Sequence, residues 1–316
     1  GGENMTCLII AINCVHPIFL NFLVGYFARR LNVVSYKVYP AMNHFAFSIL
    51  IPILVFCNIY HSDFSASFPI SLMLYTICAT IVTFIISYLI IPCFVSDCKR
   101  QSAHLQNAFR SNIGIIALSL AETMISSNSI GYFIIVVSVL TPIYNVLAIL
   151  AFGIYNQQEI RLSAIVKRII KNPILIGTIA GATFLLFRIK IPISIDSALG
   201  TLGKAGITLT LITMGAELRF SDFLLEKKSV IIGIFVRLFL VPGILTLCAV
   251  CLGFRDDNLA TIMLIFAAPI ATTAYSMARV YDSDYELIGQ LVISESFLGC
   301  FSYLFWIFLL KSTSLI

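Results

Sequence analysis

Ten long apolar stretches, separated by short polar segments, constrain the fold of this chain more than any other feature. A helix needs roughly 20 apolar residues to cross about 30 Å of hydrocarbon. The chain is 59% hydrophobic and 11% charged, whereas a soluble domain is about 45–50% apolar and about 25% charged. The sequence therefore predicts an all-α integral membrane protein with ten transmembrane helices in a lipid bilayer. The expected spans are 5–28, 38–60, 68–95, 105–126, 131–155, 172–188, 198–218, 229–253, 258–279 and 286–310.

The basic residues between these stretches predict the orientation, because Lys and Arg favour the cytoplasmic side. One set of alternate loops holds thirteen of them, and the other set holds only Arg188, Lys190, Arg255 and Lys311. We expect a multi-pass protein of the plasma membrane with both termini outside and the longest loop, 156–171, inside. This distribution explains the net charge of +5 without a nucleic-acid partner.

Two segments of similar sequence indicate an internal repeat. "HPIFLNFLVG" (16–25) and "NPILIGTIAG" (172–181) both start with Pro-Ile and place a glycine eight residues after the proline. Each half of the chain would hold five helices, and an odd number makes the second half inverted relative to the first. A 5+5 inverted repeat with a site at mid-membrane is typical of secondary transporters, such as the sodium/proton antiporter NhaA and the bile-acid symporters. In such folds the fourth and ninth helices are broken and cross.

The ninth stretch contains "IFAAPIATTAY" (265–275), which places a helix breaker in the middle of an apolar run. Pro269 removes a backbone hydrogen bond, and freed polar groups are tolerated at this depth only against protein or a water-filled cavity. The alanines around it allow another backbone to approach closely. Thr272 and Thr273 offer hydroxyls to a ligand or to the unwound chain. We therefore predict that the ninth helix is broken, although an ordinary proline kink is the alternative.

The fourth stretch, "RSNIGIIALSLAE" (110–122), is the expected counterpart, but it contains no proline. A break here would depend on Asn112, Gly114 and Ser119, of which the first two are poor helix formers.

At these residues the chain resembles the auxin efflux carrier family, which includes the plant PIN proteins and bacterial organic-anion carriers. The resemblance extends nearly end to end and is carried by "AMNHFAFSILIPILVF" (41–56), by "RSNIG" (110–114) and by "APIATTAYSMARVY" (268–281). It implies scaffold helices at 5–64 and 172–223, transport-domain helices at 65–155 and 224–316, and an elevator movement of the transport domain. It also suggests a homodimer formed through the scaffold helices.

The resemblance further implies that the crossing binds the substrate and that Asn112 contacts the substrate carboxylate. The substrate-binding residues that we expect are Asn112, Ser111, Gly114, Ser119, Pro269, Ile270, Thr272, Thr273 and Asn43. The chain departs from the family in two places. Ser119 stands where the family has a proline, and the third span lacks the Asp and Lys that plant members carry.

Six ionisable residues lie inside the predicted spans, where a charge costs roughly 3 kcal/mol or more if it is unpaired. Glu295, among small residues in "VISESFLG", is the first candidate for a proton carrier, and Glu122 is the second. Arg110 has two interpretations, a role at the site or a side chain that extends to the cytoplasmic interface. The six are Arg110, Glu122, Lys204, Glu217, Arg237 and Glu295.

These observations predict a secondary transporter of a small organic anion, with no cofactor and no metal. The resemblance suggests a carboxylate such as indole-3-acetate. The alternatives are a malonate or malate carrier and a sodium-coupled symporter of the bile-acid type. An intramembrane enzyme is not expected, because the sequence contains no HExxH and no GxSxG motif. A receptor or structural membrane protein is a further alternative.

Overall fold

The computed structural model describes residues 2–61, 69–126, 129–156, 170–171, 173–217 and 227–316. The described residues form helices connected by short segments, without a named strand. The helices are α1 (Gly2–Arg30), α2 (Val38–Phe45), η1 (Ala46–Leu50), α3 (Ile51–Tyr60), α4 (Ile70–Ile90), η2 (Ile91–Cys93), α5 (Cys98–Phe109), η3 (Ile113–Ala117), α6 (Leu118–Met124), α7 (Ile130–Asn156), α9 (Pro173–Leu186), α10 (Ile193–Glu217), α11 (Lys227–Phe235), η5 (Val236–Leu240), α12 (Val241–Cys251), α13 (Asp256–Phe266), α14 (Thr273–Val280) and α15 (Tyr285–Ser312).

In the described part of the chain, six helical segments are long and apolar enough to cross a membrane, which confirms a multi-span helical protein. They are Leu8–Arg30, Val38–Tyr60, Ile70–Cys93, Ile130–Tyr155, Lys228–Cys251 and Tyr285–Ser312. The other four expected spans correspond to the shorter helix α9, to α10, and to two helices that are interrupted, α5 with η3–α6 and α13 with α14. The ten-helix, five-plus-five arrangement stays a prediction.

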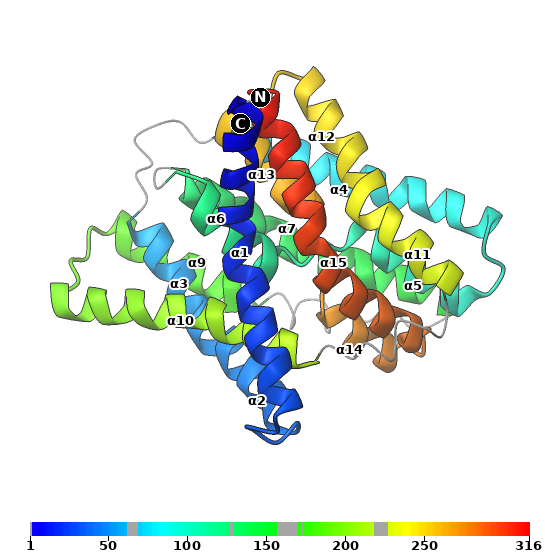
Figure 1. Ribbon diagram of the computed structural model, residues 1–316, viewed down its shortest axis with the longest axis horizontal. Helices are drawn as coiled ribbons and strands as arrows, with labels where there is room; N and C mark the ends of the chain where they lie inside the picture. The colour runs from blue at the N-terminus through cyan, green and yellow to red at the C-terminus, as the bar shows by residue number, and fades with distance from the viewer. Residues whose placement is uncertain (1, 62–68, 127–128, 157–169, 172, 218–226) are drawn as a thin grey trace.

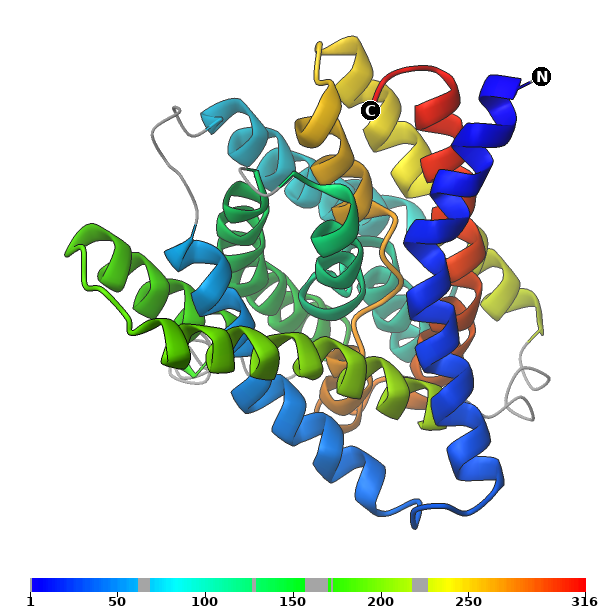
Figure 2. The same ribbon diagram turned by 60° about the vertical axis from the view of Figure 1, so that its left-hand side comes forward.

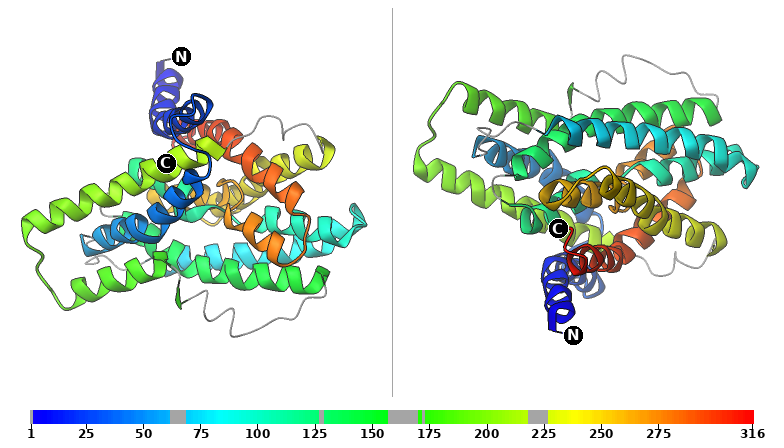
Figure 3. Two further views of the ribbon diagram at one scale, coloured as in Figure 1. Left: turned by 90° about the horizontal axis from the view of Figure 1, so that it is seen from below. Right: turned by 90° about the horizontal axis from the view of Figure 1, so that it is seen from above.

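The helices pack in two groups. In the first group α3 lies between α9 and α10, and α10 also packs along α1 (Figure 3). In the second group α4, α5 and α7 pack together, and α12 packs on α13. Helix α15 joins the groups, because it contacts α11 and α14 and also lies beside α1 (Figures 1 and 2). The expected boundaries near residues 64 and 223 and most of the 156–171 loop lie outside the described residues, so the division into scaffold and transport domains stays a prediction.

The two repeat glycines lie at close contacts between helices of the first group. A Cβ atom added to Gly25 in α1 would lie 1.8 Å from the carbonyl oxygen of Ile212 in α10. A Cβ atom added to Gly181 in α9 would lie 2.8 Å from the carbonyl oxygen of Phe56 in α3. Both positions therefore need glycine, because each lets its helix approach the backbone of another. The shared spacing that indicated a repeat thus corresponds to a shared packing role.

Candidate functional site

Two interrupted helices meet at their breaks in the second group. The backbone is not helical between α5 and η3 or between α13 and α14, and the two open stretches run antiparallel. Ser111 and Ile270 form an isolated β-bridge, and the N–H of Asn112 donates to the carbonyl of Pro269 over 2.8 Å. We call residues 110–112 and 267–272 the crossing. Its polar backbone groups bond partly to each other, as a buried break requires.

The two breaks have different local causes. Pro269 has no N–H, and a proline also disfavours the helical conformation in the residue before it. The other break contains no proline: Arg110 has φ −93° and ψ 98°, and Asn112 has φ −81° and ψ 64°. Helix resumes at Ile113, so Gly114 and Ser119 lie beyond the break. Ser119 lies in α6 and its hydroxyl donates to the carbonyl of Ile116 over 3.1 Å. Of the three residues on which the break was expected to depend, Asn112 lies in it, whereas the expectation for Gly114 and Ser119 was wrong.

Arg237 in η5 contacts both open stretches and is fully buried. Its Nε donates to the carbonyl of Ala268 over 2.7 Å, and its Nη1 donates to the carbonyl of Ala108 over 3.0 Å. Its Nη2 donates to the hydroxyl of Ser111, which also accepts from the hydroxyl of Tyr144 over 3.3 Å. One guanidinium group therefore bonds the end of α5, the first open stretch and the second.

Glu295 in α15 contacts the crossing with the opposite charge. Its Oε2 accepts from the N–H of Ile270 over 2.9 Å, and its side chain is fully buried. The side chain of Asn107 also lies within hydrogen-bonding reach of this carboxylate. The carboxylate also lies near enough to Arg237 for an electrostatic interaction. Glu295 is thus a buried carboxylate at the crossing, and its role as a proton carrier stays a prediction.

Arg110 does not extend to the membrane surface, and that interpretation was wrong. Its side chain is 3% exposed, and its Nη2 donates to Asn145 over 3.2 Å and to Thr273 over 3.0 Å. Its backbone carbonyl accepts from the N–H of Ala271 over 3.1 Å. Arg110 therefore connects the first open stretch to α7 and to the start of α14.

Asn112 has an amide group that is available for a ligand. The side chain is 5% exposed, and its Nδ2 makes no hydrogen bond to any described residue. Asn112 directly precedes η3, whose first N–H groups receive no cap from this side chain. An unbonded buried donor costs about 1–3 kcal/mol, so a ligand that accepts from Nδ2 would remove this cost.

The remaining predicted residues lie at varying distances from the crossing. Thr272 and Thr273 begin α14, and Gly114 packs against Ile174 of α9. Asn43 lies in α2, and no hydrogen bond connects it with the crossing among the described residues. Glu122 lies ten residues after Asn112, roughly 15 Å further along the helix, and accepts from the amide of Asn58 in α3.

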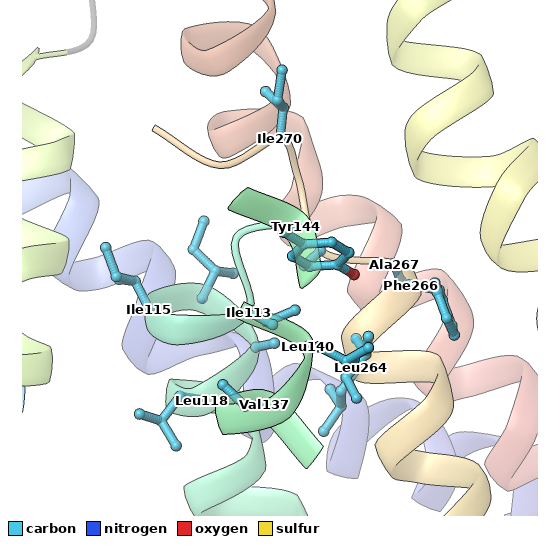
Figure 4. Packing of buried hydrophobic residues seen from close by; sticks show 14 of the residues in the cluster. Ile113, Ile115, Leu118, Val137, Leu140, Tyr144, Leu264, Phe266, Ala267 and Ile270 are labelled. Carbon is cyan, nitrogen blue, oxygen red and sulfur yellow. The ribbon is translucent and has the colours of Figure 1, made fainter. Parts of the chain in front are cut away.

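Apolar side chains enclose the crossing. Figure 4 shows them on η3, α6, α7 and α13. The labelled members include Ile113, Ile115, Leu118, Val137, Leu140, Leu264 and Ile270, all of which belong to the buried core. A bound molecule would therefore meet aliphatic surface as well as the polar groups.

The sequence signalled Arg237 only as a charge in a predicted span, and it did not indicate Asn107 or Asn145 at all. The Nδ2 of Asn107 donates to the carbonyl of Gly233 over 2.9 Å. A charge inside a membrane needs hydrogen-bonding partners, and the carbonyl groups freed by the break at Pro269 are such partners. This reasoning could have predicted that Arg237 bonds the second open stretch.

Comparison with known sequences adds one finding. A family model described as a membrane transport protein matches residues 10–307, which include both open stretches and both groups of helices. No curated protein gives a match to the chain.

Proposed function

Because the chain belongs to the auxin efflux carrier-type family of membrane transport proteins, we propose that it is a secondary transporter of a small organic anion bound at the crossing. Membership confirms the resemblance inferred from the motifs and makes transport the activity to explain.

The unbonded amide of Asn112 is the observation that supports an anion most directly. This donor is buried and lies at the N-terminal end of η3 and α6. Free backbone N–H groups and the helix dipole favour negative charge at such an end. A carboxylate there would accept a hydrogen bond from Nδ2. Because the amide is uncharged, Asn112 would not hold the anion so tightly that its release is prevented.

The apolar surroundings favour a carboxylate with an apolar or aromatic body, such as indole-3-acetate. Aliphatic side chains of η3, α6 and α7 would contact that body (Figure 4). A dicarboxylate such as malonate or malate is the second candidate, and the observation that favours it is the buried guanidinium of Arg110 on the same open stretch.

The crossing is closed, which supports a transport cycle with a movement. Ser111 is 2% exposed and Ile270 is fully buried, so a substrate reaches them only after neighbouring helices separate. In the elevator mechanism the first group, with α1, α3, α9 and α10, would be the scaffold and the second group would move. The scaffold would also form a homodimer, in the plasma membrane, with both termini outside.

Glu295 would couple transport to protons, because it is the buried carboxylate that contacts the crossing. Glu122 is the second candidate, since it bonds a helix of the proposed scaffold. A sodium-coupled cycle is the competing outcome, which dependence of transport on sodium would reveal.

The test is the current from protein reconstituted in liposomes on a solid-supported membrane. Indole-3-acetate and malonate would be compared, with and without sodium, in the wild type, Asn112→Ala, Asn112→Asp and Asn258→Ala. Asn258 is the matched control, because it lies in α13 near Asp256, about 15 Å from the crossing.

We expect a saturable current with one of the two anions. Asn112→Ala should weaken this current, Asn112→Asp should abolish it because the two negative charges repel, and Asn258→Ala should leave it unchanged. No current with either anion would overturn the proposed substrate class, and a current unaffected by both Asn112 variants would overturn the site.

A further inference from the structure

We propose that Arg237 is a positioning residue that gives the crossing its preference for anions, by occupying the negative ends of two half-helices. The inference rests on the proposed function, because it concerns the charge of the substrate at the same site.

A crossing of two broken helices brings two kinds of helix end together. The C-terminal ends of α5 and α13 present carbonyl groups without intrahelical partners, and each such end is equivalent to roughly half a negative charge. The N-terminal ends of η3 and α14 present free N–H groups and roughly half a positive charge each. Without other charges these contributions oppose one another, and the crossing would favour neither an anion nor a cation.

Arg237 acts on the two negative ends. It donates to the carbonyl of Ala108 in the last turn of α5, and to the carbonyl of Ala268 just after α13. The hydroxyl of Tyr303 donates to a third such carbonyl, that of Leu264 in the last turn of α13, over 2.8 Å. The guanidinium therefore bonds a carbonyl in the last turn of α5 and a carbonyl just beyond the end of α13, and places a positive charge near both negative ends.

The two positive ends are treated differently. The carboxylate of Glu295 accepts from the N–H of Ile270, in the stretch that leads to α14. The start of η3 has no side-chain cap, and Asn112 beside it has an unbonded Nδ2. Among the described groups, the end at η3 is therefore the positive end without an acidic partner, and the anion belongs there.

Arg237 differs from a substrate-contacting residue because its guanidinium donates to three protein oxygens. Its influence on the substrate is electrostatic and acts through the ends of the helices. A lysine at this position would keep the charge but could not satisfy the same three acceptors, so the two contributions can be separated.

The experiment compares indole-3-acetate with its uncharged analogue indole-3-acetamide, in binding to detergent-purified full-length protein. The variants are Arg237→Gln, Arg237→Lys and Arg255→Gln. Arg255 is the matched control, because its exposed guanidinium donates to the nearby carbonyls of Val250 and Phe254, and its replacement changes the net charge equally. We expect Arg237→Gln to reduce the preference for the acid over the amide about tenfold. We expect Arg237→Lys to retain most of this preference and Arg255→Gln to leave it unchanged.

If the role of Arg237 is purely structural, Arg237→Gln should weaken the binding of the acid and of the amide equally. Arg237→Lys should then bind the two compounds no better than Arg237→Gln. Either result would overturn the inference. If the glutamine variant cannot be purified as a folded protein, the lysine variant decides, since it must keep the preference for the acid.

Hydrogen exchange separates this inference from the proposed function. In Arg237→Gln we expect faster exchange of the N–H groups of Asn112 and Ala271, which bond across the crossing. If the wild type binds neither compound, the proposed substrate is wrong, and faster exchange would then show only that Arg237 holds the two open stretches in place. Exchange as slow as in the wild type would overturn the positioning role.

Discussion

The N–H of Asn112 donates to the carbonyl of Pro269 over 2.8 Å, although the two residues lie far apart in the sequence. One is the residue with the unbonded side-chain donor, and the other is the helix breaker in the second open stretch. Their direct bond means that a change at Pro269 displaces the backbone of Asn112. The crossing therefore behaves as one structural unit in which the two stretches position each other.

Gly25 permits the close packing of α1 on α10, and its replacement by alanine is expected to destabilise the protein. The added Cβ would lie 1.8 Å from the carbonyl oxygen of Ile212, and overpacking of this kind costs about 1–3 kcal/mol or more. Thermal unfolding in detergent should show a clear decrease in midpoint for Gly25→Ala.

Gly200→Ala is the matched control for that measurement. Gly200 also lies inside a helix, α10, but a Cβ there would meet no atom of another described helix within 4 Å. Alanine should leave the stability unchanged or raise it by up to about 1 kcal/mol through helix propensity. Equal midpoints for the two variants would contradict the close approach of α1 and α10.

The sequence predicted the parts of the crossing that depend on local chemistry. Pro269 breaks its helix because of its own ring, and its alanine neighbours are compatible with a second backbone, so the break could be predicted. The other break was predicted only in part, at Asn112, because Arg110 and Asn112 adopt open conformations that tertiary bonds to the second stretch and to Arg237 stabilise. Ser119 was misplaced for the same reason: nothing local determines which of several weak helix formers opens.

The hydrogen-bonding partners of Arg237 and Glu295 could not be predicted from the sequence either. Both were recognisable as charges within predicted spans, and burial followed from that. Their partners are main-chain groups of Ala108, Ala268 and Ile270, which any residue provides. A sequence does not mark such partners, and only the fold reveals them.

The ion pair between Lys99 and Asp282 is expected to contribute little to stability. Its charged atoms lie 2.7 Å apart, but both side chains are largely exposed, and exposed pairs are weakened by water and salt. The hydrogen bond to Asp282 raises the pKa of Lys99 above its ordinary value. A raised pKa adds stability that is fully present below the ordinary value, near 10.4, and is lost as the pH rises through the folded-state value.

Two measurements check this expectation. Lys99→Met should unfold at the same temperature as the wild type at pH 7 in physiological salt, with a difference only at low ionic strength. The pair should also add no pH dependence to the stability between pH 6 and pH 8. A large decrease in midpoint at physiological salt would show that the pair holds α5 against the segment before α15.

Glu295→Gln tests whether the buried carboxylate couples transport to protons. Glutamine keeps an oxygen that can accept from the N–H of Ile270, so the crossing should stay intact, but the side chain can no longer gain or lose a proton. If Glu295 carries the proton, a pH gradient should no longer drive uptake of the anion into liposomes in this variant, whereas exchange of anion without a gradient should persist.

Glu122→Gln is the matched comparison, because it removes an equivalent charge from a carboxylate that bonds Asn58 rather than the crossing. We expect this variant to keep gradient-driven uptake. The reverse pattern would assign the coupling to Glu122, and gradient-driven uptake in both variants would exclude each of them as the proton carrier.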